Sequence, residues 1–322
     1  MCMIREDYEK GQERNSDFKI REIVIESNKQ EEKPVQIIQL TDLHISYINE
    51  EDKKDEEIMH TMQCRQGYAD AVNVPAVCRL MKYASEYDCT VVTGDIYDYL
   101  SSGAIELTEK YVWEPYPEVI MAVGGHDFTR QMQTGIVNKV PFEERYKTVQ
   151  KAWKHDIRYY ARLIQNKVLV VAMDNNTDHY REWAPAYTEY QAEMLEADIK
   201  KARQNGYIIL IFQHEPISTM DPKDTIVNAL GAGPDKDFYN RTGNLESDDA
   251  ATTRAYGLIR ENADVVRGVF CGHLHYDYYT EICGSYLDEN SIRQEKKIPQ
   301  VTLACSINDD DCAGHALKII VK

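Results

Sequence analysis

The hydrophobic pattern of the chain consists mainly of short apolar runs separated by polar or helical stretches. Most of these runs are four to eight residues long and rich in Val and Ile. Such runs are typical of strands that are buried inside a sheet. They predict strands at residues 18–25, 35–40, 89–93, 119–123, 168–173, 207–212, 265–270, 301–304 and 316–321.

Two segments between these runs have the spacing of apolar residues that favours a helix, at 74–87 and 188–205. The second begins at Thr188, with Gln191 at the spacing of a capping box, and it ends before Gly206. Strands interleaved with helices indicate a layered α/β protein.

The length of 322 residues is compatible with one α/β unit, and we expect a single domain over 1–322. Residues 1–16 are expected to form a flexible or peripheral N-terminal segment. The polar stretches 49–70 and 221–249 are expected to be insertions near the functional site, because long loops in compact domains are usually functional or mobile.

Composition and charge exclude some classes of protein. The net charge of −17 argues against extended nucleic-acid binding, which requires Lys and Arg to neutralise many phosphates. No apolar run approaches the roughly 20 residues of a membrane span, and the charged N-terminal residues do not resemble a targeting signal. The sequence therefore predicts a cytoplasmic protein. Its eight cysteines form no CxxC pair, which favours reduced, mostly buried thiols.

Polar motifs follow five of the predicted strands directly. Open α/β sheets bind ligands at the carboxyl ends of their strands, so we expect these motifs to converge. Taken singly, each has an ordinary structural interpretation as a turn, a helix cap or a strand-end histidine, but five of the nine histidines lie in them. The motifs are Asp42-Leu43-His44, Gly94-Asp95-Ile96-Tyr97-Asp98, Gly124-Gly125-His126-Asp127, His214-Glu215-Pro216 and Gly272-His273-Leu274-His275. In extended backbone, His273 and His275 would project to one side, as shared metal coordination requires.

The ordered set resembles the calcineurin-like metallophosphoesterase superfamily, whose pattern is DxH, GDxxD, GNHD/E, a strand-end histidine and GHxH. The resemblance extends from about residue 35 to residue 275 and implies a four-layer α/β/β/α sandwich of two mixed β-sheets with a two-metal site. It implies that His126 is the catalytic histidine and that Asp127 orients it. The implied metal ligands are Asp42, His44 and His275 on the first metal, Asp95 as the bridge, and His214 with His273 on the second.

One position departs from this pattern. Gly125 stands where the family has an asparagine, so the second metal lacks an amide oxygen ligand. A water or a nearby side chain could replace that ligand; otherwise the second site is weakened. Three residues after Asp95, where purple acid phosphatases have a tyrosine, this chain has Asp98, which disfavours a tyrosinate-iron site. Imidazole and carboxylate ligands without thiolate suit Mn, Fe or Zn.

The resemblance implies hydrolysis of a small phosphate ester, a monoester or a diester, with nucleotides among the candidates. Two divalent metals would neutralise the phosphate and activate a bridging water, and protonated His126 would assist the leaving group. Residues expected to line the substrate pocket are Gly125, Asp98, Asn175 and His179. The alternatives are a catalytically impaired binding module on the same fold, suggested by Gly125, and a nuclease. His60, His155 and His315 receive no role from the sequence.

Overall fold

Two six-stranded sheets form the centre of the protein. The computed structural model describes residues 4–5, 18–29, 33–65, 74–131, 138–175, 187–217, 250–307 and 314–322. In spatial order, the first sheet contains β1 (Ile4–Arg5), β2 (Phe18–Ile25), β12 (Gly314–Val321), β3 (Val35–Leu40), β4 (Cys89–Thr93) and β5 (Ile120–Ala122). The second sheet contains β10 (Tyr278–Leu287), β11 (Arg293–Thr302), β9 (Val266–Cys271), β8 (Ile208–Phe212), β7 (Val168–Met173) and β6 (Tyr159–Ile164).

Both sheets mix parallel and antiparallel pairing. In the first, β12 runs parallel to β2 and antiparallel to β3, while β3, β4 and β5 are parallel. In the second, β7, β8 and β9 are parallel, and β6 and β10 are antiparallel to their neighbours. The parallel strands β3, β4, β5, β8 and β9 are those that the five motifs follow, so the topology brings the motifs to the carboxyl ends of the two sheets.

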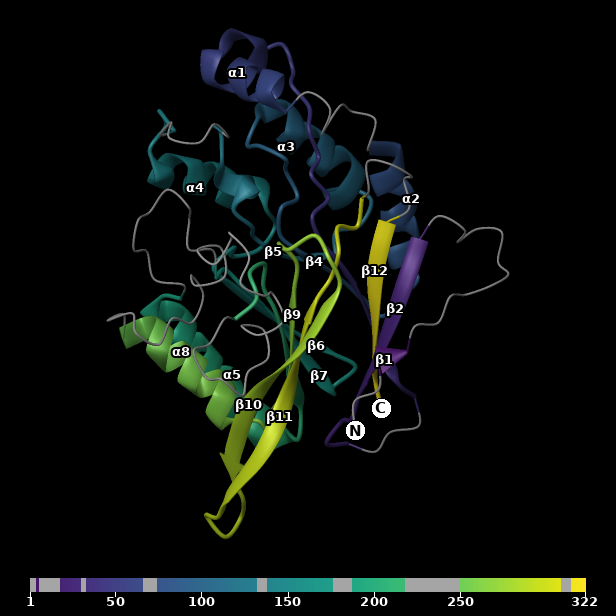
Figure 1. Ribbon diagram of the computed structural model, residues 1–322, viewed down its shortest axis with the longest axis vertical. Helices are drawn as coiled ribbons and strands as arrows, with labels where there is room; N and C mark the ends of the chain where they lie inside the picture. The colour runs from purple at the N-terminus through teal and green to yellow at the C-terminus, as the bar shows by residue number, and fades with distance from the viewer. Residues whose placement is uncertain are drawn as a thin grey trace, which may run out of the picture.

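Helices cover the outer faces of the two sheets (Figure 1). On the first sheet lie α2 (Val74–Ala84), α3 (Ser102–Thr108), the π-helix η3 (Glu109–Trp113) and α4 (Phe142–Ala152). On the second lie α5 (Glu189–Asn205) and α8 (Ala250–Glu261). The short 3-10 helices η1 (Asp52–Lys54) and η4 (His126–Phe128) and helix α1 (Glu56–Cys64) complete the described elements. None of the described helices is long and apolar enough to span a bilayer.

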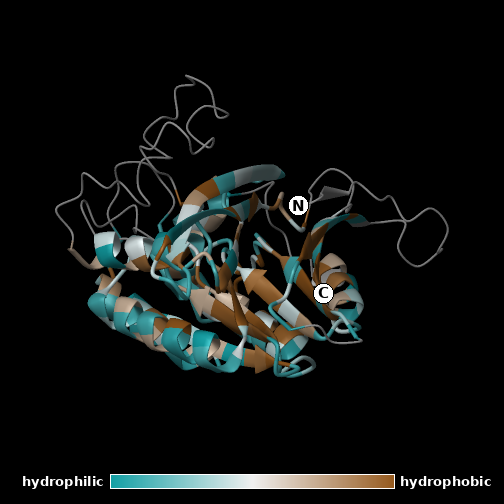
Figure 2. Cartoon of the chain, turned by 90° about the horizontal axis from the view of Figure 1, so that it is seen from below, coloured by the Kyte–Doolittle hydropathy of each residue, from teal (hydrophilic) through white to brown (hydrophobic). Residues whose placement is uncertain are grey.

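Alternation along the strands produces three apolar layers between the four layers of secondary structure. In β7, Val168 and Val170 pack between the two sheets, whereas Leu169 and Val171 pack under α5 and α8. Successive side chains of a strand point to opposite faces, so each strand contributes to two layers. Figure 2 shows the apolar strands enclosed by helices whose outer faces are polar. The predicted four-layer α/β/β/α sandwich is confirmed.

Strands that contain a run of Val, Ile or Leu residues were predicted, and strands that lack one, or whose exposed half is charged, were missed or given wrong bounds. The predicted bounds of β2, β3, β4 and β7 match the structure at both ends. The strand predicted at 301–304 is wrong in its bounds, because β11 begins at Arg293 and its first half is exposed and charged. Strands β6 and β10 escaped prediction for the same reason, since about half of their residues are only partly buried.

Helix α5 has the ends that the sequence predicts. The Thr188 side chain accepts a hydrogen bond from the backbone of Gln191, whose side chain bonds back to the backbone N–H of Thr188, and Gly206 ends the helix with φ of 70°. The insertion 49–70 is less loop-like than expected, because it contains η1 and α1. Asp55 begins α1 by accepting from the backbone N–H groups of Glu57 and Ile58.

Some expectations fall outside the described residues. These are the insertion 221–249, His179, residues 66–70 and most of the segment 1–16, of which only β1 is described. All six described cysteines are free thiols, as expected. The expectation that they are mostly buried is wrong, because only Cys89 and Cys271 are buried. Cys64 is exposed, and the other three described cysteines are half-buried.

His155 protects the free edge of the first sheet. The backbone N–H of Met121 in β5 donates to its Nε2 (3.1 Å), and its Nδ1 faces the carbonyl of Asp156 (3.2 Å). An imidazole that accepts at Nε2 must be neutral. Burial lowers the pKa of His155, which favours this neutral form. An edge-strand donor is thereby satisfied within the chain.

We expect the hydrogen bond between Met121 and His155 to make the stability of the folded protein depend on pH. Because the pKa of His155 is lower in the folded than in the unfolded chain, the stabilisation is complete above the unfolded value of about 6.5 and is lost as pH falls below it. His155→Gln keeps an acceptor for Met121 but cannot be protonated, and should flatten the fall in melting temperature between about pH 7 and 5. His60→Gln, at an exposed position of α1, is the matched control. Identical profiles for wild type and His155→Gln would contradict this role.

Candidate metal centre

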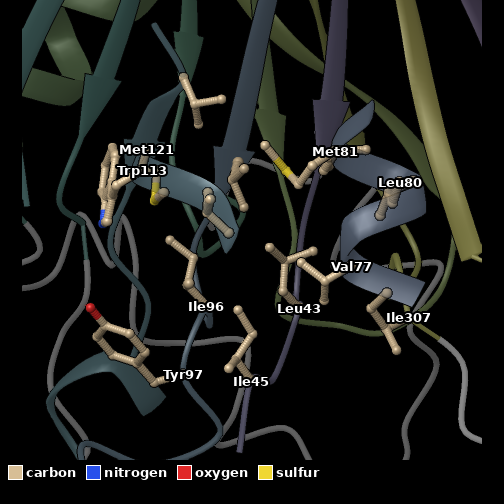
Figure 3. Packing of buried hydrophobic residues seen from close by; sticks show 14 of the residues in the cluster. Leu43, Ile45, Val77, Leu80, Met81, Ile96, Tyr97, Trp113, Met121 and Ile307 are labelled. Atoms are coloured by element: carbon tan, nitrogen blue, oxygen red, sulfur yellow. The ribbon is translucent and has the colours of Figure 1, made fainter. Parts of the chain in front are cut away.

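The first motif is held against the second by a short ladder of backbone hydrogen bonds. The N–H groups of Asp42, His44 and Ile45 donate to the carbonyls of Gly94, Asp95 and Ile96 at 3.1, 3.0 and 2.7 Å, respectively. Leu43 and Ile45 pack in the apolar cluster under the helices, beside Ile96 and Tyr97 (Figure 3). Leu43 and Ile45 thus hold this segment against the core, and Asp42 and His44 are available to the site.

Five of the six expected metal ligands have left-handed backbone. The φ angles are 51° for Asp42, 44° for His44, 50° for Asp95, 73° for His273 and 56° for His275. For residues other than glycine this region costs on the order of 1–3 kcal/mol, and it persists only where the surrounding structure enforces it. Such strain concentrates at functional sites. The expectation that His273 and His275 lie in extended backbone is therefore wrong.

Asp42, His44 and His275 form a group that we call the first triad. Asp42 Oδ1 lies 3.2 Å from His275 Nε2 and 3.8 Å from His44 Nε2, and the two histidine nitrogens are 3.2 Å apart. Ligands that each lie about 2.0–2.2 Å from one cation are separated by distances of this size. Asp42 is fully buried, and its Oδ1 has no hydrogen-bond partner among the described residues. This orphaned atom and the spacing of the triad fit a divalent cation.

Asp95, His214 and His273 form the second triad. His214 Nε2 lies 3.1 Å from Asp95 Oδ2 and 3.2 Å from His273 Nδ1. His214 Nδ1 donates to the carbonyl of Thr93 (2.7 Å), which orients the ring with Nε2 toward its partners. Burial alone would lower the pKa of His214, but the charge of Asp95 raises it to about 10. A cation bound here would compete with that proton.

Glycines allow the backbone to approach both triads closely. A Cβ on Gly124 would lie 2.2 Å from Asp95 Oδ1, and one on Gly272 would lie 2.6 Å from Asp42 Oδ2. Real side chains do not tolerate such distances, so any larger residue would displace a carboxylate of the site. The third and fifth motifs therefore begin with glycine because no larger residue fits beside the carboxylates of Asp95 and Asp42.

His126 lies beside both triads. Its ring is 4.8 Å from that of His44, and it forms a third potential cation-binding group with His44 and Asp95. Its Nδ1 donates to the backbone carbonyl of Asp98 (2.7 Å) and lies 3.7 Å from the carboxylate. Burial would lower the pKa of His126, but Asp95 and Asp98 raise it to about 9. The imidazole is therefore protonated at neutral pH when no cation competes for the charge of Asp95.

Asp98 was expected to line the substrate pocket, but its carboxylate is buried among protein groups. It lies 3.3 Å from His44 Nδ1 and forms an ion pair with Arg65 at the end of α1. Burial would raise the pKa of Asp98, but His126, His44 and Arg65 hold it well below its usual range. Arg65 was missed at the sequence level, because it lies in the polar insertion and belongs to none of the five motifs.

Asp127 does not orient His126 as expected. Its fully buried carboxylate accepts from the backbone N–H groups of Ile96 and Tyr97 (both 2.9 Å) and of Gly124 (2.8 Å), and none of its bonds goes to the imidazole. Three backbone donors at fixed positions satisfy the acid, so it ties the second motif to the third. Asp98 occupies the position beside His126 instead.

Asn175 also departs from its expected place in the pocket. It is fully buried, and its side-chain amide makes two bonds to the backbone of Glu215, one to the carbonyl (2.7 Å) and one from the N–H (3.1 Å). It therefore supports the segment that carries His214. Gly125 begins η4 with φ of −63° and ψ of −39°, an ordinary helical conformation that does not require glycine.

The sandwich of mixed sheets, with two Asp/His triads at the carboxyl ends of its parallel strands, defines a metal-dependent phosphoesterase. Residues 35–277 match the model of the calcineurin-like phosphoesterase family, and the chain belongs to this family. It is therefore a phosphoric ester hydrolase, and the two triads are the candidates for the dinuclear divalent centre that the family implies. The predicted superfamily is confirmed.

The chain is also similar to solved structures, two of which are phosphatases. A dimetal phosphatase from Danio rerio is 10% identical, with a TM-score of 0.45, over 85% of this chain and 88% of that one. A purple acid phosphatase from yellow lupin is 9% identical, with a TM-score of 0.42, over 93% of this chain and 46% of that one. The chain matches no curated protein at a significant level.

Proposed function

We propose that the protein hydrolyses a small phosphate ester, a monoester or a diester, at a dinuclear site formed by the two triads. Asp42, His44 and His275 would hold one cation and His214 with His273 would hold the other, with Asp95 as the ligand that both could share. The observation that carries this proposal is the convergence, within 3.1–3.8 Å, of nitrogen and oxygen atoms from four motifs far apart in the sequence.

The division of labour follows from the chemistry of these groups. Two bound divalent cations supply charge neutralisation of the phosphate and a nucleophile derived from water. His126 supplies the proton that the leaving oxygen needs, because its Nδ1 bond to the Asp98 carbonyl leaves Nε2 as the group that can face the substrate. Asp98 and Arg65 position this histidine and His44. Asp95 raises the pKa of His126, so if the charge of Asp95 were shared with a bound cation, the pKa of His126 would lie closer to neutrality, where proton transfer is most effective.

The test is hydrolysis of a panel of esters by the stripped and reloaded protein. We expect no turnover after chelation, and recovery with Mn, Fe or Zn, for p-nitrophenyl phosphate, bis-p-nitrophenyl phosphate or nucleotides. The relative rates on the first two decide between monoester and diester. Absence of turnover on every ester with both cations bound would overturn the proposal, and cleavage of single-stranded DNA at low salt would favour the nuclease.

A binding module that retains the fold is a second candidate, and Gly125 is the observation that favours it. Because Gly125 has helical backbone, an asparagine there meets no conformational penalty. We expect Gly125→Asn to tighten the weaker cation site about tenfold, equivalent to about 1.4 kcal/mol, and to raise turnover. Calorimetric titration with Mn measures the affinity. Gly125→Ala is the control, because it also replaces the glycine but adds no amide oxygen that could bind the cation. Equal affinities in the two variants would mean that another group already serves the second cation.

A further inference from the structure

We propose that the thiolate of Cys305 is an additional side-chain ligand of the first cation, beside the first triad. This inference rests on the proposed dinuclear site and gives it a soft ligand that its imidazole and carboxylate set otherwise lacks. Cys305 lies in none of the five motifs. It follows β11, which runs parallel to β9, so it lies at the same edge of the second sheet as the motifs that follow β8 and β9.

The position of the sulfur is the first observation. The Cys305 thiol donates a hydrogen bond to the backbone carbonyl of Asp42 (3.0 Å), a bond that the thiolate would give up on binding the cation. Its sulfur and the ring nitrogens of His44 and His275 all lie within 4.8 Å of one another. A thiolate binds zinc at about 2.3 Å, and ligand atoms this close to one another can share one cation.

The segment around Cys305 is fixed to the strands that carry the first triad. On one side, the N–H of Ala304 donates to Asp277 Oδ1 (2.9 Å), two residues beyond His275. On the other, the N–H of Ser306 donates to the carbonyl of Thr41 (3.0 Å), and the Ser306 hydroxyl accepts from the N–H of Thr41 (2.9 Å). The thiol is thus placed as reproducibly as the triad itself. Within 301–307, Cys305 is the one residue that is not fully buried.

The hydrogen bonds of Asp42 are an independent observation that supports a cation in this pocket. The two oxygens of the fully buried Asp42 carboxylate differ in their hydrogen bonds. Oδ2 accepts from the Thr41 hydroxyl (2.6 Å) and from the N–H of His273 (3.2 Å), whereas Oδ1 has no hydrogen-bond partner among the described residues. Oδ1 faces His275 and His44, in the same pocket as the sulfur. Ring nitrogens of His275 and His44 are the groups that face Oδ1, and a cation held by these atoms and the thiolate would neutralise the buried carboxylate.

Coordination by sulfur has chemical consequences for the choice of metal. The thiol gives up its proton to solvent on binding, because thiolate is the form that ligates metals. A soft ligand favours Zn and Fe over Mg, Ca and Mn, which prefer oxygen. We therefore expect the first cation to be more thiophilic than the second.

Cobalt substitution tests the inference without relying on activity. Co(II) bound by imidazole and carboxylate gives d–d bands in the visible, whereas a bound thiolate adds an intense charge-transfer band in the near ultraviolet. We expect wild type to show both. Cys305→Ser should keep the d–d bands and lose the charge-transfer band, while Cys283→Ser, which changes a partly buried thiol of β10, should keep both.

The outcomes separate this inference from the proposed function. Normal d–d bands with no charge-transfer band in wild type, or a band that survives in Cys305→Ser, would overturn the Cys305 assignment and leave the two triads intact. Absence of d–d bands in every variant would mean that the triads bind no cobalt, which overturns the proposed centre and this inference with it.

Thiol alkylation provides a second measurement on the same protein. With zinc bound, we expect iodoacetamide to modify Cys305 at least about tenfold more slowly than after chelation, because coordination occupies the sulfur. The exposed Cys64, followed by peptide mass in the same samples, is the internal reference. Equal rates at Cys305 with and without zinc would show that its sulfur is not a ligand.

Discussion

Replacing Asp95 by asparagine should lower kcat/KM by about 10³-fold or more, a larger loss than the 10–100-fold that removal of an outer partner of a metal ligand costs. Asp95 contacts His214 and accepts from the backbone N–H of His126 (3.0 Å), so it joins the second triad to the catalytic candidate. Asparagine keeps the shape of the side chain and tolerates the left-handed backbone, so the substitution removes charge and not conformation.

Thermal unfolding separates lost cation binding from lost folding. A cation at 100 times its Kd stabilises the folded protein by about 2.7 kcal/mol. We expect zinc to raise the melting temperature of wild type but not that of Asp95→Asn, and we expect the cation-free variant still to unfold cooperatively. Glu289→Gln, at an exposed position between β10 and β11, should behave as wild type in every respect. Full activity in Asp95→Asn would remove Asp95 from the site.

Replacing His126 by asparagine should lower kcat by about 10²–10⁴-fold for esters with a poor leaving group. Asparagine retains a donor for the Asp98 carbonyl but supplies no proton to the departing oxygen. For an ester that releases p-nitrophenolate, which leaves without protonation, the loss should be less than about tenfold. The measurement is kcat on matched alkyl and p-nitrophenyl phosphates, with cation content determined in the same samples.

The leaving-group dependence distinguishes proton donation from other roles of His126. A uniform loss on all esters with unchanged cation content would indicate that this residue binds the phosphate instead. Asp98→Asn serves as the comparison, because it weakens the support of His126 without removing it. We expect its loss to be smaller than that of His126→Asn and to show the same preference for the better leaving group.

The sequence predicted the positions of the site well, because position follows from topology. Each motif comes directly after a strand whose Val and Ile residues are buried on both faces, and such strands are the easiest to recognise. Once β3, β4, β5, β8 and β9 are placed in parallel, their carboxyl ends are adjacent, and so are Asp42, Asp95 and His214. The Gly-rich starts of the motifs were informative for the same reason, since Gly124 and Gly272 pack against those carboxylates.

Local geometry was less predictable, because it depends on contacts between segments far apart in the sequence. The i, i+2 spacing of His273 and His275 indicates a shared direction only in extended backbone, and their left-handed φ angles direct them to different triads. Asp127 stands next to His126 in sequence, yet its bonds run to the second motif. Arg65 reaches the site from an insertion that holds none of the five motifs. Cys305 follows the buried end of β11, which the sequence predicts as a strand at 301–304, but a lone cysteine after a strand does not by itself indicate a site.

The left-handed backbone of the triads has an evolutionary consequence. Glycine at Asp42 or His273 would relieve the steric strain of a positive φ and make the cation-free fold more stable, at the expense of a ligand. Selection for hydrolysis then retains these side chains, although glycine would give a more stable cation-free fold. A descendant released from that selection should accumulate glycine and asparagine at these positions early, which gives a sequence signature by which silent paralogues can be recognised.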